Sequence, residues 1–133
     1  MQKENSTNEI IRVFRKFARL GLNNENASPI RIYKKIEMLC PSRRSRLDMM
    51  AVYDAMRLLK LNGEDEVLEA VSKVYFEGTA IRLTKQEKGA RVLNLSFLSH
   101  CDERTIYRRL EKARVLYQKI REQEEKQFDE LFF

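Results

Sequence analysis

The chain has 133 residues, 43% of them hydrophobic and 35% charged, enough for one domain with a real core. Its longest apolar runs are too short to cross a bilayer and the N-terminus MQKENSTNE is polar, so we expect no membrane role. Cys40 and Cys101 have no metal-ligand spacing and follow no secretory signal, which predicts reduced thiols, no metal site and a cytoplasmic location. The few glycines and prolines favour helices over strands.

The net charge of +6 is unevenly distributed along the chain. Residues 81–121 contain eleven Lys or Arg and four Asp or Glu, whereas residues 122–133 contain five acids and one lysine. Such a concentration of positive charge is expected where one face of a protein meets a polyanion. A solvated, charged surface would give the same composition, so charge alone leaves both interpretations open.

Two helices are predicted in the first forty residues. Ser6–Glu9 has the pattern of a capping box and predicts a helix over about 7–20, which Gly21 would end. Ser28–Pro29 is typical of a helix start, because the missing N–H of proline costs nothing at the first helical position. This second, short helix would end at Pro41.

Two further helices are predicted on either side of Asn62. The third begins after Ser42 and runs to about Leu61, and its apolar residues cover so much of its circumference that we expect it at the centre of a bundle. The fourth begins at the acidic run 64–66 and ends at Gly78. Its buried stripe would consist of Val67, Leu68, Val71, Val74 and Tyr75.

A second capping box, Thr84–Glu87, predicts a fifth helix that runs to about Leu98 with Val92, Leu93 and Phe97 facing inward. In helix-turn-helix proteins the first helix of the motif crosses the DNA backbone, so basic residues near its start are candidates for phosphate contacts. Solvated side chains at a helix end are the equally open alternative. The residues concerned are Arg82, Lys85, Lys88 and Arg91.

After a short turn at Ser99–Cys101, Asp102 is expected to cap a long sixth helix that continues toward Glu130. A helical wheel separates an apolar face from a basic one. The apolar face consists of Ile106, Leu110, Ala113, Tyr117 and Ile120. The opposite face consists of Arg104, Arg108, Lys112 and Lys119, with Val115 among them and Glu103 and Tyr107 on the flank.

This helix has the features of a DNA recognition helix over about 103–118. Its first turns would enter the major groove, where arginine can bond guanine through two hydrogen bonds. Thr105 and Tyr107 are candidates for phosphate contacts. A surface helix with a solvated basic stripe is the alternative. The predicted DNA-binding residues are Glu103, Arg104, Thr105, Tyr107, Arg108, Lys112, Lys85, Lys88 and Arg91.

The run Asp102–Ala113 resembles the second half of a sigma-70-type region-four helix-turn-helix, and it is similar to the RinA/ArpU-type transcription regulators of phages and mobile elements. The resemblance covers about 64–121, and Glu66–Gly78 resembles the helix that precedes the motif. It implies that Glu103, Arg104, Tyr107 and Arg108 occupy the base- and phosphate-reading positions.

The sequence thus predicts an all-α, compact bundle of about six helices with a C-terminal helix-turn-helix. We expect a helical region for packing or dimerisation (1–62), a DNA-binding region (63–121) and an acidic tail (122–133) that ends in three apolar residues. The predicted function is a sequence-specific regulator of transcription that binds double-stranded DNA. A homodimer is a separate prediction, and its interface would form through the first two helices or through Val115 and Leu116. The alternative is a sigma-like adaptor or inhibitor that contacts RNA polymerase or another factor.

An enzymatic function is not expected. The sequence contains no phosphate-binding glycine loop and no plausible pair of nucleophile and base. Its only histidine, His100, has no partner at ligand spacing, and we interpret it as a turn residue without a chemical role. No cofactor is predicted.

Overall fold

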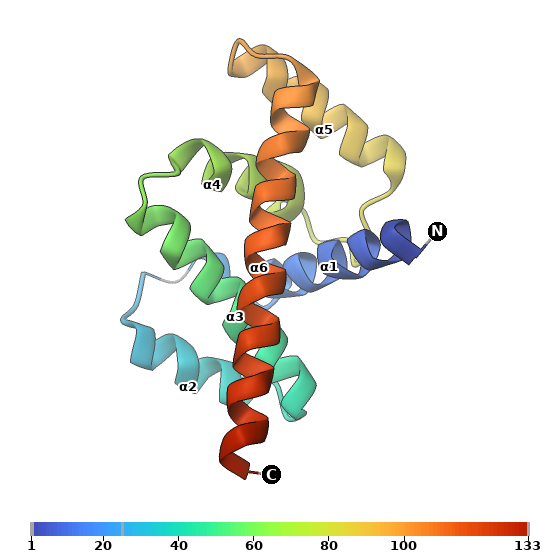
Figure 1. The fold of residues 1–133 in the computed structure, drawn as a ribbon. Coiled ribbons are helices and arrows are strands. Elements are labelled where there is room, and N and C mark those ends of the chain that lie inside the picture. The colour runs from blue at the N-terminus through green and yellow to red at the C-terminus, as the bar shows by residue number, and fades with distance from the viewer. Residues whose placement is uncertain (1, 25, 133) are drawn as a thin grey trace.

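The computed structural model describes the backbone of residues 2–24 and 26–132, and the side chains from Ser6 to Leu131 except Glu25. Within these residues the chain is entirely helical, with no strand, as the sequence predicts (Figure 1). The elements are α1 (Gln2–Arg19), the 3₁₀ segment η1 (Leu22–Asn24), α2 (Pro29–Leu39), α3 (Arg43–Leu61), α4 (Asp65–Val71), the π-helical segment η2 (Ser72–Phe76), α5 (Lys85–Leu98) and α6 (Glu103–Phe132).

The 30-residue α6 runs along the whole molecule, and α3, α4 and α5 pack against it (Figure 1). At 1.5 Å per residue it is about 45 Å long. Its predicted apolar face is confirmed, because four of its five residues are buried and the fifth packs against the core. They are Ile106, Leu110, Ala113 and Tyr117, with Ile120 partly buried.

The C-terminal part of α6 is fastened to α3. The Arg121 Nε lies 2.8 Å from a carboxylate oxygen of Asp48, and the Arg43 guanidinium lies 2.6 Å from Asp129 and covers the ring of Phe128. The predicted continuation of this helix toward Glu130 is therefore confirmed. Of the apolar residues at the C-terminus, the Leu131 side chain is exposed, whereas the Phe132 side chain and Phe133 lie outside the described part of the chain.

An aromatic cluster joins α1, η2 and α6 at the centre of the core. The ring of Phe14 meets the ring of Tyr75 at 5.6 Å and that of Tyr117 at 5.5 Å, both edge to face, and Phe76 stacks on its other side. Edge-to-face aromatic pairs stabilise a core beyond the area they bury. Because the three elements come from distant parts of the sequence, this cluster determines how α1 crosses α6.

Three of the predicted helix starts have the expected hydrogen bonds. The side chains of Ser42, Thr84 and Asp102 each accept a bond from the backbone N–H three residues on, at 3.1, 3.1 and 2.8 Å. The helix ends agree as well, since Gly21 and Gly63 follow α1 and α3 with φ of 76° and 72°, a conformation that glycine adopts without strain.

The predicted start of the first helix is wrong. The helix α1 begins at Gln2, so Ser6 and Glu9 lie inside it and do not form a cap. Gln2, Lys3 and Glu4 all have good helix propensity, and nothing between Gln2 and Ser6 breaks the helix. A serine in such a context stays in the helix instead of ending it.

The predicted inward face of α5 is partly wrong. Val92 is buried as expected, but Leu93 and Phe97 are 43% and 71% exposed, and Leu95 and Ser96 are buried in their place. The buried positions follow the helical spacing i, i+3, i+4 and form a narrow stripe. This stripe is narrow because α5 packs mainly against η2 and α6.

The predicted fourth helix is confirmed in extent but not in geometry. It begins as α4, and from Ser72 it widens into the π-helical segment η2. Where η2 ends, two arginines from other elements donate hydrogen bonds to backbone carbonyl oxygens. The Arg15 Nη1 donates to the Tyr75 carbonyl at 3.0 Å, and the Arg91 Nη1 donates to those of Val74 and Glu77, both at 2.9 Å.

A group of acidic and phenolic side chains connects α2, α3 and α6. The Tyr33 hydroxyl donates to Asp54, and Glu124 lies beside the same Asp54 carboxylate. Burial, with the hydrogen bond to Asp54 and the charge of that residue as smaller causes, raises the pKa of Glu124 to about 9. Its Oε2 is buried and has no hydrogen-bond partner among the described residues.

Stability should therefore fall as the pH rises. A carboxyl group whose pKa is raised in the folded state contributes most below its ordinary pKa of 4.5, and the contribution is lost as the pH rises toward 9. We expect Glu124→Gln, which imitates the protonated acid, to unfold at higher urea concentration than the wild type at pH values well above 4.5, with the difference shrinking toward pH 4.5. Glu122→Gln, on the exposed side of α6, is the control and should follow the wild type. A Glu124→Gln variant with an unchanged urea midpoint across this pH range would contradict the assignment.

Candidate nucleic-acid interface

A short turn, Ser99 to Asp102, joins α5 to α6. The Ser99 N–H donates to the Leu95 carbonyl at 2.9 Å, and the Cys101 N–H donates to that of Ser96 at 3.1 Å, which closes the end of α5. His100 takes the left-handed conformation, with φ of 53°, at the position where glycine is most frequent. The role of His100 in the turn thus lies in its backbone conformation, and its side chain is exposed.

The start of α6 is held in place by its cap. Asp102 accepts bonds from both the backbone N–H and the hydroxyl of Thr105, each at 2.8 Å. These bonds hold the pKa of Asp102 below its ordinary value, so its carboxylate remains ionised over the neutral range. The Thr105 hydroxyl is therefore engaged in the cap.

Arg104 and Arg108 project from the exposed side of the first turns of α6. They are four residues apart and so lie on the same side of the helix. Neither makes an ion pair or a side-chain hydrogen bond within the described residues. Glu103 and Tyr107 are exposed beside them, Tyr107 to 40%. The first two turns thus present two extended cations next to a carboxylate and a phenol.

Most other basic residues of α6 are engaged within the fold. Arg109 pairs with Glu66 at 3.0 Å, and Arg114 donates to the Tyr75 hydroxyl at 2.6 Å. Lys112 pairs with Glu64 at 2.6 Å, but both side chains are substantially exposed. Such a surface ion pair is worth at most about 1 kcal/mol, so Lys112 can exchange Glu64 for another anion at little cost.

The basic residues predicted on α5 lie in different environments. Lys85 is exposed at the start of the helix and Lys88 is half-buried one turn further on. Arg91 differs from both, because its guanidinium donates to the backbone carbonyls at the end of η2. Arg91 thus stabilises the backbone at the end of η2 through these hydrogen bonds.

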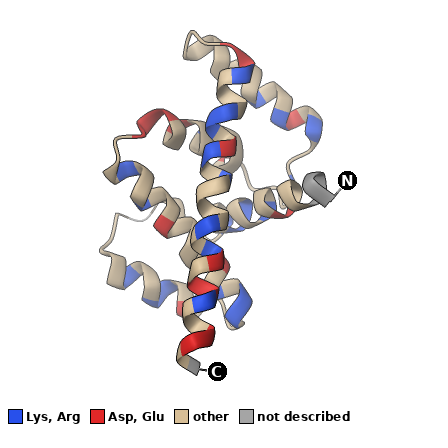
Figure 2. Ribbon diagram, viewed as in Figure 1, with Lys and Arg blue, Asp and Glu red and all other residues tan. Residues whose placement is uncertain are grey.

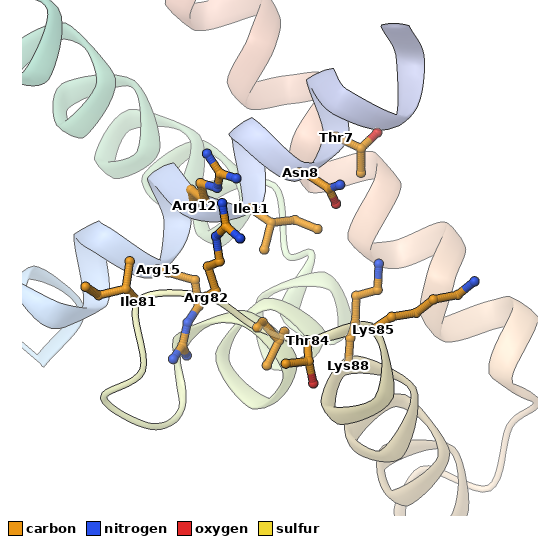
Figure 3. Close-up of a pocket in the computed structure, with 11 residues that line it drawn as sticks. Thr7, Asn8, Ile11, Arg12, Arg15, Ile81, Arg82, Thr84, Lys85 and Lys88 are labelled. Carbon is orange, nitrogen blue, oxygen red and sulfur yellow. The ribbon is translucent and has the colours of Figure 1, made fainter. Parts of the chain in front are cut away.

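The structure also brings together basic residues that the sequence did not associate. A pocket of about 640 Å³ lies between α1 and the segment that leads into α5 (Figure 3). Its basic lining residues are Arg12 and Arg15 of α1 and Arg82, Lys85 and Lys88 near the start of α5. Arg12 and Arg15 were missed because they lie about seventy residues before Arg82 in the sequence, and no local pattern reveals that proximity.

The charge distribution along α6 is uneven (Figure 2). Lys and Arg dominate from Arg104 to Arg121, whereas Asp and Glu are concentrated in its last turns. A polyanion would therefore be attracted to the N-terminal half of α6 and repelled from its C-terminal end. The two acids at the start of the helix, Asp102 and Glu103, are the local exception.

In the described part of the chain no three His, Cys, Asp or Glu side chains lie close enough to hold a metal ion. The described helices also include none that is long and apolar enough to cross a membrane. Comparison of the chain with protein-family models, with curated proteins and with solved structures finds no match. The candidate interface is therefore defined by its own geometry and charge.

Proposed function

We propose that the chain is a sequence-specific, double-stranded DNA-binding regulator of transcription whose α6, over about 103–118, enters the major groove. The observation that carries the proposal is the contrast between two groups of basic residues on α6. Arg109, Arg114 and Arg121 are bound within the fold. Arg104 and Arg108 extend from its first turns and make no ion pair or hydrogen bond with a described side chain, although both lie close enough to the Asp102 carboxylate to lower its pKa.

The spacing of the two arginines suits base recognition. Four residues of α-helix advance about 6 Å, close to the rise of two base pairs. Each guanidinium could bond the O6 and N7 atoms of a guanine, which is the most frequent specific contact in the major groove. Glu103 lies on the same turn, where a carboxylate could accept from the amino group of cytosine.

The burial of the opposite face supports the proposal, because a recognition helix must be rigid. Ile106, Leu110 and Ala113 are completely buried, and the aspartate cap closes the start of the helix. Phosphate contacts would come from Tyr107, from Lys112 after exchange of Glu64, and from Lys85 on α5. The predicted dimer contact at Val115 and Leu116 stays a prediction.

A second candidate function rests on a different surface. Leu93, Phe97 and Leu98 of α5 are 43%, 71% and 68% exposed, although they are large and apolar. Clustered exposed apolar side chains are typical of contacts with other proteins. They favour an adaptor or inhibitor that binds RNA polymerase or another factor through α5, with or without DNA.

Salt dependence and sequence selection distinguish the two functions. If the DNA proposal is right, repeated selection from a pool of random duplexes should enrich a common site. The affinity for that site should fall by at least about tenfold between about 50 and 200 mM salt, because each neutralised phosphate releases counterions. Binding of polymerase without any retention of DNA at low salt would instead support the adaptor function and contradict the DNA proposal.

A further inference from the structure

We propose that the pocket between α1 and the start of α5, here called the Arg12–Arg82 pocket, binds a phosphate group. Arg12 of α1 and Arg82 of the segment before α5 both line this pocket, and Figure 3 shows their side chains in the same part of it. Neither makes an ion pair within the described residues. Cations that line one pocket with no carboxylate among the described lining side chains are stabilised by an anion bound there.

The rest of the lining has the same electrostatic character. Lys85 and Lys88 line the pocket from the first turn of α5, and no acidic side chain is among its described lining residues. Thr84, which also lines it, is the N-cap of α5, so the positive end of that helix is directed at the pocket. The helix dipole and the lining cations therefore act in the same direction, and the Glu87 carboxylate, which accepts a hydrogen bond from Thr84 at 2.9 Å, offsets part of their charge.

Arg15 forms a buried wall of the pocket. Its guanidinium is directed away from Arg12 and Arg82, toward the backbone carbonyls that follow η2 (Figure 3). It is 1% exposed, and its Nε has no hydrogen-bond acceptor among the described residues. A buried donor without an acceptor is uncommon, and the Arg15 cation adds positive charge to this wall of the pocket.

The size and the apolar lining indicate what the phosphate is attached to. At about 640 Å³ the pocket is several times larger than a phosphate group and falls within the range of small-molecule sites. Ile11, Ile81 and Leu83 add apolar side chains to the lining. The ligand class is therefore a phosphate ester or diphosphate, supplied either by a free organophosphate or by the backbone of DNA.

Calorimetric titration with inorganic pyrophosphate tests the proposal on the whole chain. We expect saturable binding by the wild type and a loss of affinity of about tenfold or more in Arg12→Gln/Arg82→Gln. The matched control is Arg31→Gln/Lys34→Gln, which removes the same charge from α2, and it should bind as the wild type does. No binding by the wild type at about 10 mM pyrophosphate, or an equal loss in both double variants, would overturn the proposal. Circular dichroism would confirm that each variant is folded.

Two further measurements complete the test. The first distinguishes a free organophosphate from the DNA backbone as the source of the phosphate. The second distinguishes the proposal for the Arg12–Arg82 pocket from the proposal for the recognition helix. If duplex DNA displaces pyrophosphate from the wild type, the pocket binds the DNA backbone; if DNA and pyrophosphate bind together, it binds a free ligand. Arg104→Ala/Arg108→Ala should keep the affinity for pyrophosphate while it loses affinity for DNA. A negative result for phosphate binding in the Arg12–Arg82 pocket therefore does not contradict the recognition-helix proposal, and a negative result for DNA binding by α6 does not contradict the pocket proposal.

Discussion

Replacement of Arg15 by methionine should lower the free energy of unfolding by at least about 3 kcal/mol, a large part of the stability of a small domain. Arg15 is the largest fully buried side chain in the described part of the molecule. Its guanidinium donates to the carbonyl oxygens of Tyr75, Glu77 and Ala80, where η2 ends and the chain turns toward α5. Methionine has a similar helix propensity but leaves these acceptors without a donor, at about 1–3 kcal/mol for each buried group.

The surroundings of Arg15 make the substitution informative. Burial lowers the pKa of Arg15, and the charges of Arg91 and Arg19 lower it further, so the folded state tolerates this cation at a cost. The cost is offset because Arg15 and Arg91 together satisfy the backbone at the end of η2. Loss of Arg15 leaves Arg91 alone to hold the junction on which α5 and the Arg12–Arg82 pocket depend.

Urea unfolding followed by far-ultraviolet circular dichroism measures the effect. The control is Arg19→Met, the same substitution one turn later on α1, at an exposed position. We expect the control to change the free energy of unfolding by less than about 0.5 kcal/mol, as surface substitutions usually do. An Arg15→Met variant within about 1 kcal/mol of the wild type, or an equal loss in both variants, would show that Arg15 is not the brace described here.

The start and the buried face of α6 were predictable because their signals are local and agree with one another. The aspartate cap at Asp102, the apolar residues at helical spacing and the preceding short turn all lie within about twenty residues. Each of them depends on backbone geometry that the sequence alone determines. The burial of Ile106, Leu110 and Ala113 confirms the wheel, although the use of the opposite face in DNA binding stays a proposal.

The inward face of α5 was not predictable for a physical reason. Val92, Leu93, Leu95, Phe97 and Leu98 place apolar side chains on most sides of the helix. Periodicity then no longer distinguishes one face, and the buried one is selected by whichever elements pack against it. Here η2 and the start of α6 select Val92 and Leu95, which leaves Leu93 and Phe97 exposed.

The functions of the arginines depend on contacts between distant segments. The charge count in 81–121 is the same whether a given arginine braces a carbonyl, pairs with a glutamate or extends into solvent. Arg91 and Arg108 are alike in sequence terms, yet Arg91 is bound to the backbone of η2 whereas Arg108 extends freely from α6. Only the tertiary structure distinguishes these two arginines. It removes Arg91 from the set of candidate DNA-binding residues that the sequence predicts.

The largest expected effect on function is the loss of DNA affinity when both exposed arginines of α6 are removed. In Arg104→Ala/Arg108→Ala two potential bidentate contacts disappear, each worth about 1–3 kcal/mol of base discrimination. Alanine keeps the helix intact because both positions are exposed and alanine has the highest helix propensity. The folded scaffold, anchored by the buried face of α6, should therefore be unchanged.

The most direct test is a fluorescence anisotropy titration of a duplex enriched by selection, with three proteins compared at about 100 mM salt. They are the wild type, Arg104→Ala/Arg108→Ala, and Arg31→Ala/Lys34→Ala, which removes the same charge from α2. We predict that the α6 variant binds at least about tenfold more weakly than the wild type, while the α2 variant stays within about twofold of it. Equal affinities for all three proteins, or an equal loss in both variants, would contradict the assignment of α6 as the recognition helix.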